Sequence, residues 1–412
     1  MRMSRRQALA VGLATATAAA PQLSRAQPAR SIKVGFLTDM SGPYKDITGP
    51  TGAVCAQQAV ADFGAAEKGI QVEFLIADHQ HKPDVGVGIV REWLDRQDVD
   101  VIMDVGNSSI AFAVNDIVVQ RNKVHLNTGG ASSELTGRNC NANTIHWPYD
   151  TWMLANSTGK AVVHAGGDKW FVLAANYTFG VTLKDEITAV VEGAGGRITG
   201  SAAHPFPGTM DFSSFLLRAQ SSGCNVIGLA NAGVDLLNCV KQGAEFGLAR
   251  RGIRMAALVA FIQDVHALGL EVAQGLNLTE SFYWDMNDQT RAFTSRVRPR
   301  LPGGNYPNMD HASAYSAMLH YLKVVQAMGV DAAKADGRAA VEAMKRLPTE
   351  DDCFGRGEIR ADGRKIHPAY LFEVKKPQES RGPWDYYKLA ATTPAENAFR
   401  PLSQGHCRLV QG

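Results

Sequence analysis

Short apolar runs alternate with helical patterns along residues 32–283. In one example, the run at 101–103 is followed by Ile110, Val114 and Ile117, which share one helical face. This alternation predicts parallel sheets that are covered by helices on both faces, the α/β class. The expected strands are 32–38, 71–77, 101–103, 124–126, 170–175, 197–203, 226–229, 255–259 and 276–283. The expected helices between them include 51–63, 85–96, 151–165, 212–221 and 234–246.

The alternation breaks at residues 146–150 and then restarts, which predicts two Rossmann-like lobes. After residue 284 the pattern becomes helical, and this part of the chain is expected to return to the first lobe. Its predicted helices are 289–300, 311–328 and 338–346. A β-hairpin is expected next, with strands at 355–360 and 367–374 and a turn at Asp362-Gly363.

Two strands of the first lobe end in small, hydroxyl-rich loops, which read Gly-Asn-Ser-Ser at 106–109 and Gly-Gly-Ala-Ser-Ser at 129–133. In open α/β sheets, ligands bind at the carboxyl ends of the strands. We expect Ser108 or Ser109 to be the N-cap of the following helix, whose free backbone N–H groups favour a carboxylate or another anion. An ordinary βαβ unit with a capped helix is the alternative explanation of this pattern.

The first 26 residues have the organisation of an export signal. A basic segment that contains Arg5 and Arg6 precedes an apolar stretch at 8–20, and small residues lead up to Ala26. The context of the arginine pair, Ser-Arg-Arg-Gln-Ala-Leu, resembles a twin-arginine signal, with a plain secretory signal as the alternative. We therefore expect cleavage near Ala26 and a periplasmic mature protein.

Composition narrows the function further. A net charge of +2 gives no electrostatic footprint for nucleic acid, so no nucleic-acid partner is expected. The length of 412 residues is enough for two domains. No run after the signal reaches the roughly 18 apolar residues of a membrane span.

The cysteines are too sparse for a disulfide scaffold, although export permits a disulfide. They are Cys55, Cys140, Cys224, Cys239, Cys353 and Cys407. Their pairing cannot be assigned from sequence, although Cys140 and Cys353 lie in loops rich in Gly, Asn and Asp. The loop Asp-His-Gln-His at 78–81 lacks further ligands at zinc spacing, so we expect neither a metal nor a cofactor.

Several segments together resemble the leucine/isoleucine/valine-binding protein family, the type I periplasmic solute-binding proteins of ABC importers. They are the opening strand 32–36 with Met-Ser-Gly-Pro at 40–43, the loops 106–109 and 129–136, Phe-Gly at 179–180 and Asp-Phe-Ser-Ser at 211–214. They follow one another in the family's order over nearly the whole mature chain.

The resemblance implies two lobes that close on a ligand like a hinged trap, joined by three crossovers. The crossovers are expected near 147–150, 283–285 and 369–372. Lobe one is then expected at 27–147 and 284–370, and lobe two at 148–283 and 371–412.

The resemblance also implies which residues hold the ligand. In the family, a hydroxyl and backbone groups of lobe one bind the ligand carboxylate, and these correspond to Ser109 and the loop with Gly129, Gly130 and Ala131. The family has Thr at the position of Ala131, so one hydroxyl contact is missing here. Asn107, Ser108 or a water is expected to replace that contact.

The remaining expected contacts surround the rest of the ligand. Tyr44 and Phe179 are expected to cover its side chain, and Asn231 lies beside an alanine that replaces a family aromatic. Asp264 is the only acid near the position of the family's ammonium partner, so specificity for α-amino acids stays open. Hinge residues Trp147, Trp284 and Asp285 complete the predicted site, and such an aromatic-rich cleft also suits aromatic acids. The alternative is that Trp147 and Trp284 only pack the hinge.

We therefore expect a solute-binding subunit that delivers a small carboxylate to ABC permease and ATPase subunits at the inner membrane, as a monomer. A hydrophobic amino acid is the family's default solute, and an aromatic acid or another small carboxylate or amide is the alternative. An enzyme is not expected, because no Gly-x-Ser-x-Gly, His-Glu-x-x-His or P-loop motif occurs. A repressor of the same fold would need a DNA-binding segment where the export signal stands. A periplasmic sensor for a membrane receptor would use the same trap and stays open.

Overall fold

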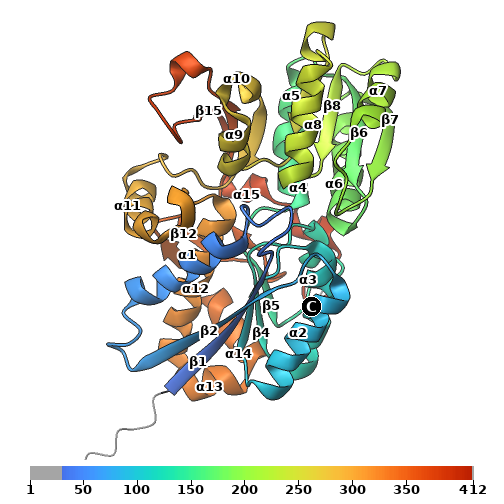
Figure 1. Ribbon diagram of the computed structural model, residues 1–412. Coiled ribbons are helices and arrows are strands. Elements are labelled where there is room, and N and C mark those ends of the chain that lie inside the picture. The colour runs from blue at the N-terminus through green and yellow to red at the C-terminus, as the bar shows by residue number, and fades with distance from the viewer. Residues whose placement is uncertain (1–29, 411–412) are drawn as a thin grey trace, which may run out of the picture.

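The computed structural model describes residues 30–410 and consists of two lobes joined end to end (Figure 1). The predicted export signal therefore lies outside the described residues. Lobe one contains a five-stranded parallel sheet in the order β2-β1-β3-β4-β5. Its strands are β1 (Arg30–Thr38), β2 (Ile70–Asp78), β3 (Val101–Asp104), β4 (Val124–Asn127) and β5 (Thr144–His146).

Helices cover both faces of this sheet because alternate residues of each strand point to opposite sides. On β1, Val34 and Phe36 belong to the core that includes α1 and α12, whereas Leu37 packs with Trp93 in the core under α2 and α3. The first helices of lobe one are α1 (Gly49–Phe63), α2 (Pro83–Arg96), α3 (Ser108–Arg121) and the 3-10 turn η1 (Ser133–Leu135).

The later part of the chain packs with lobe one. It contributes α11 (Asp288–Val297), η4 (Arg298–Arg300), η5 (Pro302–Gly304), α12 (Met309–Met328), α13 (Val330–Ala335) and α14 (Gly337–Arg346). Helix α12 is buried along most of its length against α1 and the sheet, which explains its apolar and small residues.

Lobe two is built around a second parallel sheet in the order β7-β6-β8-β9. Its strands are β6 (Lys169–Ala175), β7 (Arg197–His204), β8 (Val226–Ala230) and β9 (Arg254–Ala257). Its helices are α4 (Thr151–Leu154), the π-helical turn η2 (Ala155–Gly159), α5 (Lys160–His164), α6 (Thr178–Gly193), α7 (Ser213–Ser221), α8 (Gly233–Glu245), η3 (Ala249–Arg251), α9 (Ile262–Leu268) and α10 (Leu270–Ala273). The two parallel sheets confirm the predicted α/β class with two lobes.

A three-stranded antiparallel sheet extends lobe two. It consists of β10 (Asn277–Glu280), β14 (Ala369–Val374) and β15 (Tyr387–Thr393), with η6 (Pro377–Glu379) between the last two strands. Leu278, Phe372 and Tyr387 from these strands share a core with Leu229 of β8. The predicted strand at 276–283 corresponds to β10, which pairs antiparallel with β14.

The predicted β-hairpin is wrong in its second strand. The turn at Asp362-Gly363 is present, but β12 (Gly355–Ile359) pairs with the short β13 (Lys365–Ile366), and β11 (Thr349–Asp351) lies on its other side. Pro368, which has no N–H to donate, interrupts the ladder after β13. The chain then enters lobe two as β14 and pairs with β10 instead.

The end of the chain returns to lobe one, whereas the sequence placed all of 371–412 in lobe two. After β15, the short helices α15 (Ala395–Ala398) and α16 (Leu402–Gly405) precede a disulfide between Cys407 and Cys140 of lobe one. Arg400 also pairs with Glu134 at 2.8 Å. The tail thus adds a fourth passage between the lobes to the three that were expected.

Two other features concern the described part of the chain. No helix within residues 30–410 combines the length and apolar character needed to cross a membrane. In the same range, no three His, Cys, Asp or Glu side chains are gathered so that they could hold a metal ion.

Candidate functional site

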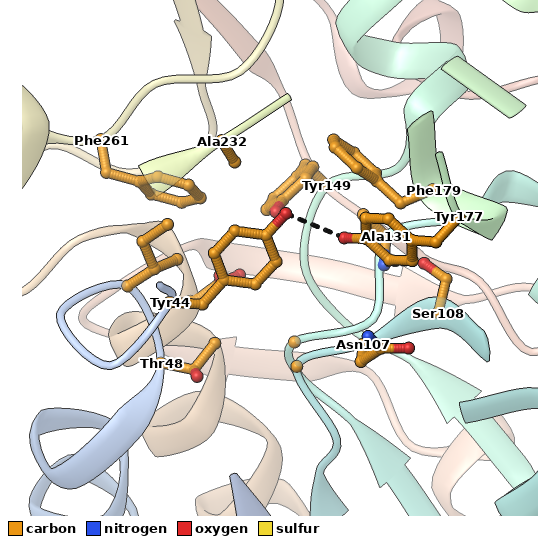
Figure 2. Close-up of a pocket in the computed structure, with 14 residues that line it drawn as sticks. Tyr44, Thr48, Asn107, Ser108, Ala131, Tyr149, Tyr177, Phe179, Ala232 and Phe261 are labelled. Carbon is orange, nitrogen blue, oxygen red and sulfur yellow. Dashed lines mark hydrogen bonds between the residues drawn. The ribbon is translucent and has the colours of Figure 1, made fainter. Parts of the chain in front are cut away.

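A small cavity lies between the two lobes, where the strands of lobe one end. It contains about 320 Å³ of unfilled space, part of which is open to solvent. Lobe one contributes Tyr44, Ile47, Thr48, Gly106, Asn107, Ser108, Gly129, Ala131 and Asp310. The first crossover contributes Tyr149, and lobe two contributes Tyr177, Phe179, Ala232 and Phe261 (Figure 2).

The floor of the cavity is the N-terminus of α3. Asn107, rather than Ser108 or Ser109, is the N-cap, and its Oδ1 accepts the N–H groups of Ser109 at 3.0 Å and Ile110 at 3.2 Å. Asn107 takes this position because its backbone is extended, which turns the side chain back over the first helical turn. Asn107 thus occupies two of the N–H groups at the helix start, and the helix dipole still favours an anionic group near this end.

Ser108 joins the two loops that were predicted to bind the ligand. Its Oγ accepts the backbone N–H groups of Ala131 at 3.2 Å and Ser132 at 3.1 Å. Both loops therefore lie at the same edge of the sheet, as parallel strands require. The predicted loop residues Asn107, Ser108, Gly129 and Ala131 line the cavity together, whereas Gly130 does not line it.

A buried hydrogen-bond chain orients Asn107. Its Nδ2 donates to Nδ1 of His81 at 3.1 Å, and Nε2 of His81 donates to Asp39 at 2.8 Å. Asp39 also accepts the backbone N–H of Tyr44 at 2.7 Å. Burial alone would raise the pKa of Asp39, but these hydrogen bonds and the nearby His81 lower it to about 2. The His-rich loop therefore serves to position the site.

Aromatic rings form the opposite wall. The hydroxyls of Tyr44 and Tyr177 lie 3.0 Å apart and join the two lobes (Figure 2). Phe206 stacks on Tyr177 with ring centroids 4.4 Å apart and lies 5.2 Å from Tyr44. Burial raises the pKa of both tyrosines above the ordinary value, so both hydroxyls are neutral hydrogen-bonding groups.

Ser109 does not line the cavity, in contrast to the expectation that it binds the ligand. Its hydroxyl lies 2.7 Å from that of Thr178 on α6, in lobe two. Two further contacts repeat this arrangement along α6, Ser132 with Thr182 at 3.2 Å and Ser133 with Glu186 at 2.5 Å. We call these three pairs the serine latch. Residues 178, 182 and 186 are four apart and so share one helix face.

The latch leads to a prediction for Ser109→Ala. Because its hydroxyl bonds the other lobe, its removal should destabilise the closed state by about 1 kcal/mol and weaken ligand binding about fivefold. A double-mutant cycle with Thr178→Ala, read by calorimetry, should give a coupling energy of about 0.5–1.5 kcal/mol. Additive effects of the two substitutions would contradict the latch and favour a direct contact between Ser109 and the ligand.

The other predicted lobe-two polar residues have structural roles. Asn231 is fully buried and bonds Nε2 of His204 at 3.2 Å. Asp264 accepts the N–H of Phe261 at 2.9 Å and so caps α9. Burial raises the pKa of Asp264 to about 7. Neither residue lines the cavity.

The predicted hinge residues also lie outside the cavity. Trp147 is fully buried and donates to Ser316 at 2.9 Å, and Trp284 donates to the carbonyl of Trp384 at 2.7 Å. Asp285 pairs with Arg291 at 2.9 Å and with Arg381 at 2.6 Å. The polar groups of these side chains are bonded to protein partners. We therefore assign the three residues a structural role at the hinge rather than a contact with the ligand.

Eight of the lining residues were not among the predicted ligand contacts. They are Ile47, Thr48, Gly106, Tyr149, Tyr177, Ala232, Phe261 and Asp310. Tyr149 and Tyr177 lie beside motifs that the sequence did single out. Asp310 had no signal of its own, because an acid in a first helical turn is common for electrostatic reasons.

Comparison with known proteins places this geometry in a family. The sequence profile described as periplasmic binding protein matches residues 31–381. The chain belongs to the periplasmic binding protein family. Members of the family are solute-binding proteins rather than enzymes, which agrees with a cavity between two lobes. The resemblance inferred from the sequence is confirmed at this level.

The chain is also similar to solved structures of periplasmic binding proteins. A periplasmic binding protein from Burkholderia mallei is 44% identical with a TM-score of 0.87, over 92% of this chain and 99% of that one. A branched chain amino acid ABC transporter periplasmic ligand-binding protein from Burkholderia xenovorans is 36% identical with a TM-score of 0.80, over 92% and 99%.

More distant structures share the fold alone. A solute-binding protein from R. palustris, in complex with 4-hydroxybenzoate, has a TM-score of 0.80 at 21% identity, over 89% of this chain and 97% of that one. No curated protein sequence matches the chain significantly.

Proposed function

We propose that the chain captures a small hydrophobic carboxylate between its lobes and delivers it to the permease of an ABC importer. The observation that carries this proposal is the composition of the cavity. One part of its lobe-one lining is the N-terminus of α3 with loop backbone from Gly106 and Gly129, and aromatic rings from both lobes line much of the rest. The first part suits a carboxylate, and the second suits an apolar side chain.

Capture requires closure rather than chemistry. The serine latch and the Tyr44–Tyr177 contact exist only when the lobes meet, so they stabilise the closed form. A ligand that touches both lobes adds to these contacts and shifts the population toward closure. The closed form would then present a surface that the membrane permease recognises, as the ABC transporter relatives imply.

A hydrophobic amino acid is the first candidate solute, and the relative from B. xenovorans supports it. An aromatic acid is the second, and the number of rings around the cavity supports it. Five aromatic side chains line the space: Tyr44, Tyr149, Tyr177, Phe179 and Phe261.

A binding screen tests the proposal. The exported protein, purified from the periplasm, would be titrated by thermal shift with hydrophobic amino acids, aromatic acids and aliphatic acids. A ligand at about 100 times its dissociation constant adds about 2.7 kcal/mol to the free energy of unfolding, which raises the melting temperature clearly. We expect a response to at least one carboxylate. A response only to amides, sugars or amines would contradict the proposal.

A further inference from the structure

One acidic side chain in the cavity has no partner. Asp310 lies in the first turn of α12, is 1% exposed and lines the cavity. Neither of its carboxylate oxygens has a hydrogen-bond partner within residues 30–410. The helix start does not use this side chain, because Asn308 caps α12 and accepts the N–H of Asp310 at 2.9 Å. A buried carboxyl without partners is costly unless something else binds it.

The charges around Asp310 make a cation the suitable partner. Its ionisable neighbours are the buried acids Asp104 on β3 and Glu280 on β10, and it also interacts electrostatically with Tyr149. No basic side chain is among the described residues that line the cavity. Burial and the two acids raise the pKa of Asp310 well above its ordinary value. Without a cationic partner, Asp310 therefore favours the protonated carboxyl, and an incoming cation would favour the ionised one.

Asp264 cannot take this role, although the sequence pointed to it. Its carboxylate caps α9 through the N–H of Phe261 at 2.9 Å, and it does not line the cavity. The first candidate for a cation partner thus belongs to lobe two and is already bonded, whereas Asp310 belongs to lobe one and is free of protein partners.

We propose that Asp310 binds a cationic amino group of the solute, so that the ligand is an amino acid rather than an acid without an amine. This inference rests on the proposed capture of a carboxylate at the same site. The ligand carboxylate would lie at the N-terminus of α3, its amine at Asp310, and its side chain among the aromatic rings. Rings such as Tyr149 add a favourable surface for the cation.

An amino acid and two analogues, each lacking one charged group, separate the role of Asp310 from the capture of a carboxylate. Leucine carries both groups, 4-methylpentanoate lacks the amine, and 3-methylbutylamine lacks the carboxylate. A parallel set is phenylalanine, 3-phenylpropanoate and 2-phenylethylamine. Calorimetry should show an amino acid binding at least about 30-fold more tightly than its analogue without the amine, because the latter leaves Asp310 unpaired.

Each outcome bears on one proposal or on both. Equal or tighter binding of the acids without an amine would overturn the role of Asp310 and leave the capture of a carboxylate standing. Binding of the amines alone would support Asp310 and overturn the capture of a carboxylate. Binding of none of the six compounds would overturn both.

Two substitutions test which acidic residue causes the preference for ligands that carry an amine. Asp310→Asn keeps the shape of the side chain but removes its charge, so the affinity for amino acids should fall at least about 30-fold. Its affinity for the acids without an amine should stay the same. Asp264→Asn tests the rival position, and it should preserve the preference for the amine. Loss of that preference in Asp264→Asn, with the preference intact in Asp310→Asn, would overturn the inference.

Proton release provides a readout that does not depend on a substitution. Because the free site favours protonated Asp310, binding of an ammonium group should release a proton. The affinity should therefore rise with pH between about pH 6 and 8, where an aliphatic amine stays protonated and a carboxylate stays ionised. Calorimetry in buffers of different ionisation enthalpy measures this release. Proton uptake, or the same pH profile in Asp310→Asn, would overturn the inference.

Discussion

Gly233→Ala is expected to prevent full closure of the lobes and to weaken ligand binding about 10- to 100-fold, while the protein stays folded. Gly233 begins α8 in lobe two with φ +55°. A Cβ there would lie 2.3 Å from the carbonyl oxygen of Pro43 and 3.1 Å from the ring of Tyr44, both in lobe one. Overpacking of this kind typically costs 1–3 kcal/mol, and each 1.4 kcal/mol is a tenfold change in affinity.

The penalty applies mainly to the closed state, because the clash partners belong to the other lobe. The open state carries only the backbone strain of alanine at positive φ, about 1–2 kcal/mol. Ligand affinity therefore falls through the closure equilibrium. Calorimetry would measure the affinity, small-angle scattering with ligand would report the remaining opening, and denaturant unfolding would report stability.

Gly252→Ala is the matched control. Gly252 also lies in lobe two with φ +75°, but a Cβ there would have no neighbour within 4 Å. It should lose similar stability and keep normal affinity. If both variants bound ligand as tightly as the unmodified protein, Gly233 would not limit closure.

Removal of the disulfide between Cys140 and Cys407 is expected to reduce the free energy of unfolding by about 2–4 kcal/mol. The two residues are 267 positions apart, so the bond restricts a very long loop of the unfolded chain. The folded state is affected as well, because the tail that carries Cys407 also positions Arg400 against Glu134 and the carbonyl of Ser133. Without the disulfide, these contacts between the tail and lobe one should weaken. Ser133 belongs to the serine latch, so a modest loss of ligand affinity should accompany the loss of stability.

The measurement compares the protein with Cys140→Ser/Cys407→Ser in denaturant, each with and without reductant. Reductant should destabilise the unmodified protein to the level of the double variant and leave the double variant unchanged. The four remaining cysteines, Cys55, Cys224, Cys239 and Cys353, are buried and unpaired, so they should not contribute. Equal stability of the two proteins under oxidising conditions would contradict the prediction.

Local patterns determined much of the architecture. The apolar runs at 32–38, 170–175 and 226–229 correspond to β1, β6 and β8, because strands buried in a parallel sheet need continuous apolar sequence. The loops at 106–109 and 129–131 lie at strand ends, where the topology of a parallel sheet places ligands. Both inferences depend only on neighbours in sequence, so the sequence was sufficient for them.

Only the tertiary structure decided which side chains face the cavity. Ser109 has the residue type and the position of a ligand contact, yet the approach of α6 turns it to Thr178. Asp310 is more than 200 positions from the loop at 106–109, and only the packing of α12 on lobe one brings it to the site.

The same holds for the partner of Cys140, which the returning tail supplies from the far end of the chain. The sequence by itself determined the two α/β lobes and the loops at the strand ends, residues of which line the cavity. Contacts between distant segments decided the latch, the disulfide and the acid in the cavity. Such contacts depend on how the lobes and the tail pack together, and no local pattern of residues encodes that packing.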